Sequence, residues 1–380
     1  MTDLAELAAD IVWPDHDAST RAHDHVIGNP LLVALGSHVE WLAAAQGQFP
    51  PHEIRAARLI VFVADHGIAE AGVSAFGAGA TAKRVGDIRR GGSRLNALAE
   101  LAGVTVRLVE TDVLPNRIDL GPALTPEQVA AAVAVGAAIA DEEIDAGCDL
   151  LIAANLGTAS TTSAAALIAV LTGSEPVKVV GRGGSRIDDF GWMRKVTAIR
   201  DARRLGWAHR SSPMDLLAAI GGPDTAALAG FLLRAAARRT PVLLDGLVAA
   251  AAGVLATMEA PFAARWWRAA QVTGEPAQLL ALSRLDLPAL ADLGMATGDG
   301  SGALVALGIL RAAVAATTEY PQATTTEYPQ ATTTEYPQVG IEPPPSADVG
   351  LHEGRGDDPD LRPPAPDVQA QFGALGDASR

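Results

Sequence analysis

Cysteine and aromatic residues are scarce in this sequence. Its one cysteine, Cys148, excludes a disulfide framework and a cysteine-rich zinc site. Aromatic residues make up 4% of the chain and hydrophobic residues 49%, so the core must be built mainly from aliphatic side chains. Much of that share is alanine, which favours helices. We therefore expect a globular chain in which Cys148 is a small buried residue and not a reactive thiol.

Positive charge and long apolar runs are also lacking. The formal net charge of −15 argues against nucleic acid or an anionic membrane as the main partner. The first twenty residues carry several acids and precede the first arginine, unlike a secretory signal. The longest uncharged run, residues 150–174, contains too much Thr, Ser, Asn and Gly to span a bilayer. These features predict a soluble cytoplasmic protein.

The composition changes sharply near Thr317. An eight-residue unit, Thr-Thr-Glu-Tyr-Pro-Gln-Ala-Thr, repeats from there, and a proline-rich acidic stretch follows to Arg380. So few apolar residues cannot offset the entropy lost on ordering, so we predict a disordered tail over residues 317–380. We interpret this tail as a repeat-expanded linker, and the alternative is a tail that docks on a partner.

Short apolar runs alternate with helical segments through the body of the chain. Thr125 and Ser212, each followed by proline, are typical of helix starts. This alternation predicts an α/β fold with a doubly wound, mostly parallel sheet. We expect an N-terminal segment over residues 1–24 and an α/β domain over 25–316. The segment 1–50 and the region 255–316 should pack as a helical second layer or small domain. The predicted strands are 59–64, 105–109, 150–153, 177–180 and 242–244.

Asp65, His66 and Gly67 follow a predicted buried strand directly and form one sharp turn. Ligands of open α/β sheets bind at such turns, at the carboxyl ends of strands. The alternative is a turn in which Asp65 caps the next helix and His66 fills space. Further along the chain follow Ser74, Phe76 and Lys83.

Two loops carry the residue types that bind phosphate. One follows the strand at 150–153 and contains Gly157, Thr161 and Thr162. Hydroxyls and backbone N–H groups at a helix N-terminus form an anion site, although an ordinary Ser/Thr-capped helix has the same pattern. The other contains Gly181 and Gly183, with Lys195 in the helix that follows. A plain strand-to-helix connection is the alternative for this loop.

A fourth segment ends in a glycine-rich turn before the last helix. It runs from Leu290 through Met295 to Gly298-Asp299-Gly300. Asp299 is a candidate general base, and the alternative is an acid that caps the helix and is stabilised by its dipole.

In this order, the four segments resemble the nicotinate-nucleotide–dimethylbenzimidazole phosphoribosyltransferases. The resemblance covers most of residues 25–316. It implies transfer of phosphoribose from nicotinate mononucleotide to dimethylbenzimidazole or a related base, giving α-ribazole phosphate for the lower ligand of cobalamin. It implies small-molecule substrates, no cofactor, no metal and a homodimer. The residues it implies are the base Asp299, a base pocket of Ser74, Phe76, Lys83 and Met295, and a phosphate and ribose site of Gly157, Thr161, Thr162, Gly181, Gly183 and Lys195.

The sequence departs from the family pattern at several of these places. The family has glutamate where Asp299 and Asn155 stand, glutamine where Lys83 stands, a Gly-Asn pair at Ala159-Ser160, and histidines at Gln271 and Gln278. Aspartate is one methylene shorter than glutamate, and a misplacement of about 1 Å can lower a rate on the order of a hundredfold. Three interpretations stay open: a working phosphoribosyltransferase, a catalytically degenerate paralogue that binds a nucleotide or protein partner, and an unrelated α/β nucleotide-binding enzyme.

Overall fold

The computed structural model of the protein describes residues 2–27, 32, 34–111 and 116–317. The predicted tail, apart from Thr317, lies outside the described residues. The strands are β1 (Ala57–Val63), β2 (Thr105–Glu110), β3 (Leu150–Leu156), β4 (Val242–Leu244), β5 (Trp267–Gln271) and β6 (Ala289–Ala291). The helices are α1 (Leu4–Ala8), α2 (His16–Ile27), α3 (Gly36–Gln46), η2 (Gly67–Ala71), α4 (Ala80–Arg89), α5 (Arg94–Ala102), α6 (Pro126–Asp145), α7 (Ser160–Leu171), α8 (Pro176–Val179), α9 (Asp189–Gly206), η3 (Trp207–His209), α10 (Pro213–Ile220), α11 (Pro223–Ala237), α12 (Gly246–Glu259), η4 (Pro261–Trp266), α13 (Pro276–Leu285) and α14 (Ser301–Ala315).

The described strands form one parallel sheet in the order β2-β1-β3-β4-β5-β6. The chain first moves outward from β1 to β2 and then returns to the other side of β1 with β3. In an open parallel sheet, ligands bind where the strand order reverses in this way, at the carboxyl ends of the strands. The predicted doubly wound parallel sheet is therefore confirmed, and its switch point lies between β1 and β3.

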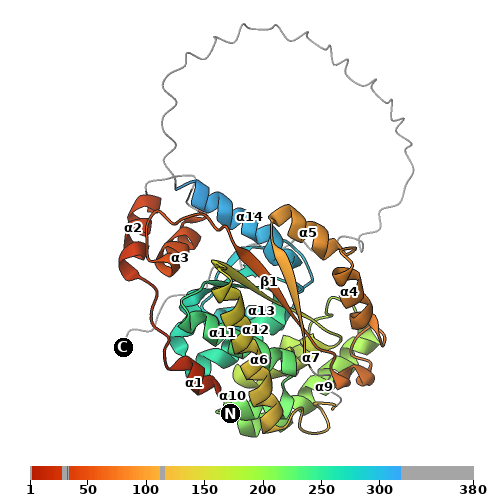
Figure 1. The fold of residues 1–380 in the computed structure, drawn as a ribbon. Helices are drawn as coiled ribbons and strands as arrows, with labels where there is room; N and C mark the ends of the chain where they lie inside the picture. The colour runs from red at the N-terminus through yellow and green to blue at the C-terminus, as the bar shows by residue number, and fades with distance from the viewer. Residues whose placement is uncertain (1, 28–31, 33, 112–115, 318–380) are drawn as a thin grey trace, which may run out of the picture. The chain divides into compact units, whose positions relative to one another are not determined.

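Helices cover both faces of this sheet (Figure 1). Along β1, Ile60 and Phe62 enter the core beneath α6, α7, α11 and α12, whereas Leu59, Val61 and Val63 enter the core beneath α3, α5 and α14. Because successive strand residues point to opposite faces, a strand buried on both sides must be apolar at every position. This is why β1 and β3 appear in the sequence as continuous apolar runs.

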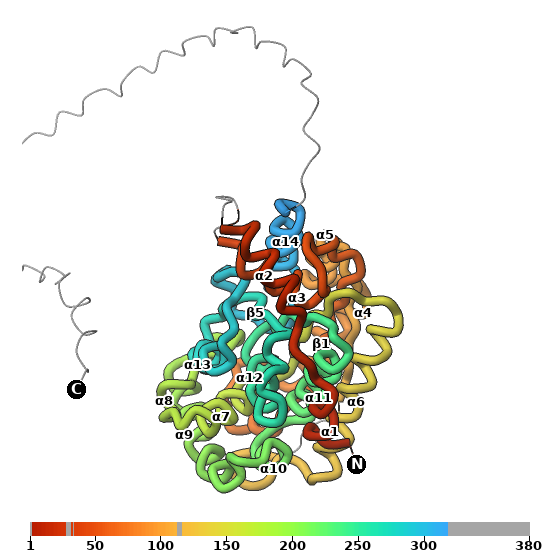
Figure 2. The backbone as a smooth tube through the Cα atoms, turned by 90° about the vertical axis from the view of Figure 1, so that its left-hand side faces the viewer, coloured from red at the N-terminus to blue at the C-terminus, as the bar shows by residue number. Residues whose placement is uncertain are grey.

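Residues 1–50 were expected to pack with residues 255–316, and α3 from the first range contacts η4 and α14 from the second. A small third core joins α2, α3 and Ala313 of α14, and Figure 2 shows these helices side by side. The expectation of a wholly helical 255–316 is wrong, because β5 and β6 lie in that range and belong to the main sheet. The described part of residues 1–321 forms one compact unit.

One predicted strand is wrong. Residues 177–179 fall in the short helix α8, where Pro176 occupies the first turn and Lys178 is exposed, and Val180 follows its end. Proline favours the first turn of a helix, and a half-exposed apolar run of four residues fits either structure. The predicted helix starts are confirmed: Thr125 forms a capping box with Gln128, and the Ser212 side chain accepts a hydrogen bond from Asp215 N–H. Cys148 is buried, as expected.

The packing of α6 against α11 depends on a glycine. A Cβ atom on Gly136 of α6 would lie 1.8 Å from the Ala227 carbonyl oxygen of α11. Gly136→Ala should therefore lower the free energy of unfolding by about 1–3 kcal/mol, as overpacked cores do. Gly308→Ala is the matched control, because an added Cβ at this exposed position in α14 meets nothing within 4 Å. That variant should gain up to about 1 kcal/mol. Equal chemical-denaturation midpoints for the two variants would contradict this packing.

Candidate active site

A cleft of about 700 Å³ opens at the carboxyl end of the sheet. Its walls come from the segments that follow β1, β3, β4, β5 and β6, and from the start of α5. The structure therefore brings four sequence segments into one cavity, including the two phosphate-type loops and the Asp299 turn. Among the predicted site residues, those that line the cleft are Phe76, Gly157, Thr161, Met295 and Asp299.

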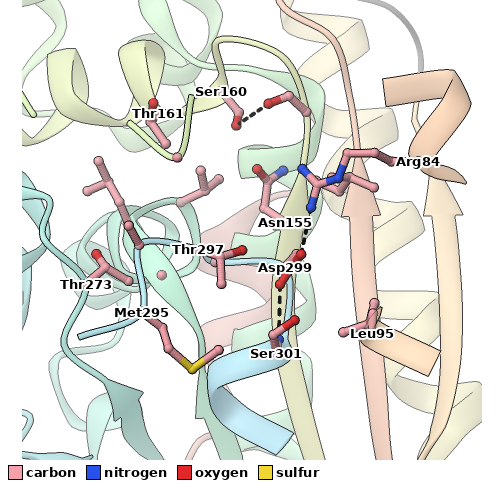
Figure 3. Close-up of a pocket in the computed structure, with 18 of the residues that line it drawn as sticks. Arg84, Leu95, Asn155, Ser160, Thr161, Thr273, Met295, Thr297, Asp299 and Ser301 are labelled. Carbon is pink, nitrogen blue, oxygen red and sulfur yellow. Dashed lines mark hydrogen bonds and ion pairs between the residues drawn. The ribbon is translucent and has the colours of Figure 1, made fainter. Parts of the chain in front are cut away.

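Asp299 faces this cleft from the turn before α14 (Figure 3). Its side chain is 13% exposed, and its Oδ2 accepts a 2.7 Å hydrogen bond from Nη2 of Arg84. Its Oδ1 accepts a 3.1 Å hydrogen bond from Ser301 N–H, at the first residue of α14. Asp299 therefore contacts the helix N-terminus, as the capping alternative expected, and also presents its carboxylate to the cleft.

Arg84 takes the place in the cleft that was expected for Lys83. Both residues lie on α4, where Lys83 is exposed and does not line the cavity, whereas Arg84 lines it and reaches Asp299. Consecutive helical residues point about 100° apart, so a shift of one residue changes the wall they face. Ser74 also stands outside the lining, and its Oγ accepts a hydrogen bond from Phe76 N–H, which fixes the turn that carries Phe76.

The loop after β3 presents Gly157, Ser160 and Thr161 to the cleft, but Thr162 is fully buried in the core. Gly157 is required here, because a Cβ atom at this position would lie 1.8 Å from the Ala64 carbonyl oxygen. Ala159 adopts a left-handed backbone with φ of 63°, which costs an alanine of order 1–2 kcal/mol. This explains in physical terms why glycine suits that position.

Lys195 lies directly behind the hydroxyl loop. Its amino group donates to Thr161 Oγ1 at 3.3 Å and to the Gly181 carbonyl at 3.1 Å, and it lies 3.9 Å from Glu275 Oε2. The side chain is 1% exposed, and this burial lowers the pKa of Lys195 although Glu275 opposes the shift. The cleft is therefore lined by Gly184 in this region. Behind that lining lie Gly181, Gly183 and Lys195.

A buried polar network beneath the cleft was not predicted. His66 Nε2 lies 3.1 Å from the Asp224 carboxylate, and Asn155 Nδ2 donates to Asp224 Oδ2 at 2.7 Å and to the Phe62 carbonyl at 3.1 Å. Burial alone would raise the pKa of Asp224, but His66 and the hydrogen bonds around it hold that pKa below its usual range. Both amide hydrogens of Asn155 are used, so its Oδ1 is left as the acceptor that this cleft-lining residue offers.

In the turn after β1, Asp65 does not cap the next helix, which was the alternative interpretation of this turn. Asp65 Oδ1 accepts hydrogen bonds from Thr158 N–H at 2.8 Å and from Thr81 Oγ1 at 2.5 Å, so it joins the β1 turn to the β3 loop and to α4. The helix η2 that follows has no side-chain cap. Asp65 and His66 therefore support the cleft from behind and hold its walls together.

The two glutamines at the family's histidine positions are structural in this chain. Gln271 and Gln278 are buried and stand outside the cleft lining. Gln271 Nε2 donates to Asp245 Oδ1 and to the Thr297 carbonyl, and Gln278 Oε1 accepts from Thr273 N–H. These glutamines therefore lie behind the cleft and do not form part of its lining. Their effect passes through the turns that they hold.

Asp245 is a fully buried acid under the Asp299 turn. Its oxygens accept hydrogen bonds from Gln271 Nε2 at 2.9 Å and Gly300 N–H at 2.8 Å. Burial, assisted by the nearby Asp299 charge, nevertheless raises the pKa of Asp245 to about 7. The carboxyl therefore takes up a proton as the pH falls below neutrality, next to the turn that carries Asp299.

This raised pKa predicts a pH-dependent stability. Between about pH 4 and pH 7 the folded protein holds a proton on Asp245 that the unfolded chain has released, so the free energy of unfolding falls as pH rises, by up to about 4 kcal/mol. Asp245→Asn removes the titrating carboxyl group. As the pH rises from about 4 to 7, the free energy of unfolding of the parent, measured in denaturation curves, should therefore fall relative to that of the variant. A difference that stays constant with pH would contradict the prediction.

The described residues contain no group of three or more His, Cys, Asp or Glu side chains placed to hold a metal ion. The helices of the described part of the chain are also too short or too polar to cross a membrane.

Comparison with known proteins adds to this geometry. Residues 15–327 match the model of a family described as "Phosphoribosyltransferase". A nicotinate-nucleotide–dimethylbenzimidazole phosphoribosyltransferase of Mycobacterium ulcerans is 46% identical over 79% of this chain and 88% of its own length. The protein of that name from Mycobacterium avium is 46% identical over 80% of this chain and 92% of its own length. A crystal structure of the Thermus thermophilus enzyme of that name superposes with a TM-score of 0.71, at 31% identity, over 80% of this chain and 96% of that one.

Proposed function

This chain belongs to the nicotinate-nucleotide–dimethylbenzimidazole phosphoribosyltransferase family, and we propose that its cleft transfers phosphoribose from nicotinate mononucleotide to dimethylbenzimidazole or a related base. The product is α-ribazole phosphate. The observation that carries the proposal is the convergence of Gly157, Thr161, Gly184 and Asp299 on one cavity at the sheet's switch point. A cytoplasmic location and a homodimer stay predictions from the sequence.

The reaction sets three tasks for the cleft. A nitrogen lone pair of the incoming base forms a bond to the anomeric carbon, and the electrons of the broken carbon–nitrogen bond go to the pyridinium ring, which leaves as nicotinate. The ring is already cationic in the nucleotide, so it leaves without being protonated. The protein must therefore hold the phosphate, orient two heterocycles and accept one proton from the incoming base.

We assign the phosphate to the wall formed by Thr161, Ser160 and Gly184. Hydroxyls and backbone N–H groups at the start of α7 offer donors to an anion, and the helix dipole adds to their effect. Lys195 lies behind this wall and donates to Thr161 Oγ1, so its charge reinforces the site without direct exposure.

We assign the incoming base to the apolar part of the cleft, between Phe76, Leu95 and Met295. The free Oδ1 of Asn155 accepts a hydrogen bond from a ring N–H, but an amide cannot remove the proton. Of the carboxylates in the lining we assign the proton to Asp299, and its bond to Arg84 holds it in place.

The test is incubation of the full-length protein with nicotinate mononucleotide and a panel of benzimidazoles, with free nicotinate measured by chromatography. We expect release that depends on the added base, and faster release by Asp299→Glu, whose carboxylate reaches about 1 Å further. If only the Asp299→Glu variant releases nicotinate, the natural chain is a degenerate relative. If neither releases any, the transferase proposal is wrong.

A further inference from the structure

Arg84 places a cation inside the cleft that is only partly used by the protein. A guanidinium has five N–H donors, and the hydrogen bond of Arg84 to another described residue is the one from Nη2 to Asp299 Oδ2. The Arg84 side chain is 42% exposed, in contrast to the buried Lys195. In Figure 3 the guanidinium extends from α4 toward Asp299, on the side of the cavity away from Thr161.

The charges around Arg84 leave it available to a ligand. The charged residues of the described cleft lining are Arg84, Asp87, Arg94, Glu275 and Asp299. Asp87 pairs with Arg90, and Glu275 accepts from Gly183 N–H and lies beside Lys195. Arg84 and Arg94 are the cations of the described lining, and Arg84 is the one that bonds to the proposed reacting carboxylate, with donors remaining for an anion.

The substrate chemistry indicates which anion this is, and this step rests on the proposed function. Nicotinate mononucleotide carries two anionic groups, a phosphate and a ring carboxylate. The phosphate is assigned to the Thr161 and Gly184 wall, and dimethylbenzimidazole carries no anion. A carboxylate fits the planar fork of a guanidinium, which binds both of its oxygens.

We propose that Arg84 binds the ring carboxylate of nicotinate mononucleotide and makes the enzyme select the nicotinate nucleotide over the nicotinamide nucleotide. Arg84 holds Asp299 through one N–H and the ring carboxylate through others, so it fixes the departing ring relative to the proton acceptor. A neutral carboxamide offers this cation a weaker acceptor and also places an NH₂ group near it. Arg84 is thus a specificity-determining residue.

The experiment compares the two nucleotides as donors to dimethylbenzimidazole, with full-length protein, Arg84→Gln and Arg84→Lys. We expect the preference for nicotinate mononucleotide in kcat/KM to fall roughly 10- to 100-fold in Arg84→Gln, because a charge-assisted hydrogen bond is lost. Arg84→Lys should keep part of the preference. Any effect of the freed Asp299 on the chemistry applies to both donors and cancels in their ratio. Arg89→Gln is the matched control: it removes one exposed cation from the same helix, whose partner is Glu110 at the sheet edge, and should leave the ratio unchanged.

The outcomes separate this inference from the proposed function. Equal losses for both nucleotides would mean that Arg84 contacts the phosphate or only supports the fold, and would overturn the inference. If the natural protein transfers from neither nucleotide, the proposed reaction fails, and calorimetric binding of the two nucleotides still tests Arg84. A selective loss of nicotinate mononucleotide binding in Arg84→Gln would then support the inference. Unchanged relative affinities would overturn it.

Discussion

Lys195→Met should lower the rate of nicotinate release at least about a hundredfold, while the protein stays folded. The lysine donates to Thr161 Oγ1 and to the Gly181 carbonyl, so it both positions and charges the proposed phosphate wall. Loss of one well-placed donor from an electrostatic site costs on the order of 10²–10³ in rate. Methionine has nearly the same shape and fills the same buried space, so packing is retained. The measurement is steady-state nicotinate release with dimethylbenzimidazole.

A second variant separates chemistry from stability. Removing Lys195 alone leaves Glu275 without its cation, 12% exposed, with an Oε2 that has no hydrogen-bond partner among the described residues. Lys195→Met combined with Glu275→Gln removes both charges, so it should recover thermal stability and remain inactive. Lys178→Met is the control for loss of an exposed lysine, and should match the natural protein. A folded Lys195→Met variant with unchanged kcat and KM would exclude this lysine from the site.

Asp299→Asn should reduce the rate of transfer by about 10²–10⁴, the usual contribution of a positioned general base. Asparagine retains the size of the side chain and an oxygen that accepts from Ser301 N–H or Arg84, so the turn before α14 should persist. The affinity for nicotinate mononucleotide should change far less than kcat, because the proton transfer belongs to the chemical step.

Asp292→Asn is the matched control for Asp299→Asn. Asp292 is exposed in the same segment, and its Oδ1 accepts from Gly294 N–H without contact with the cleft. This variant should retain the natural rate. If Asp299→Asn also retained it, the proton would have to leave by another route, and the role assigned to Asp299 would be wrong.

The sequence alone predicts the position of a strand where burial on both faces makes every residue of that strand apolar. β1 and β3 are buried on both faces, so their apolar runs are unbroken and their positions were predicted. β5 contains Arg268 next to a Trp pair, and β6 is only Ala289–Ala291, so neither has a strand pattern of its own. They are strands because each pairs with a neighbouring strand outside its own segment, as Trp267 does with Val242 and Ala289 with Ala269. Such pairing is tertiary information.

The candidate site also has parts that the sequence predicts and parts that depend on tertiary structure. Glycine and hydroxyl turns directly after strands could be predicted, because parallel strands end at one edge of the sheet. The choice between Lys83 and Arg84 could not, because it depends on the rotation of α4 about its axis. The pairs Asn155–Asp224 and Gln271–Asp245 join residues from different strands and helices. An isolated acid or amide in the sequence gives no sign of such a partner.

The most direct test of the account is a crystal structure of the full-length protein with nicotinate mononucleotide bound. The account predicts the phosphate against Thr161 and Gly184, in front of Lys195, with the anomeric carbon between that wall and Asp299. A phosphate bound instead by Arg84 and Arg94, with the sugar away from the β3 loop, would contradict it.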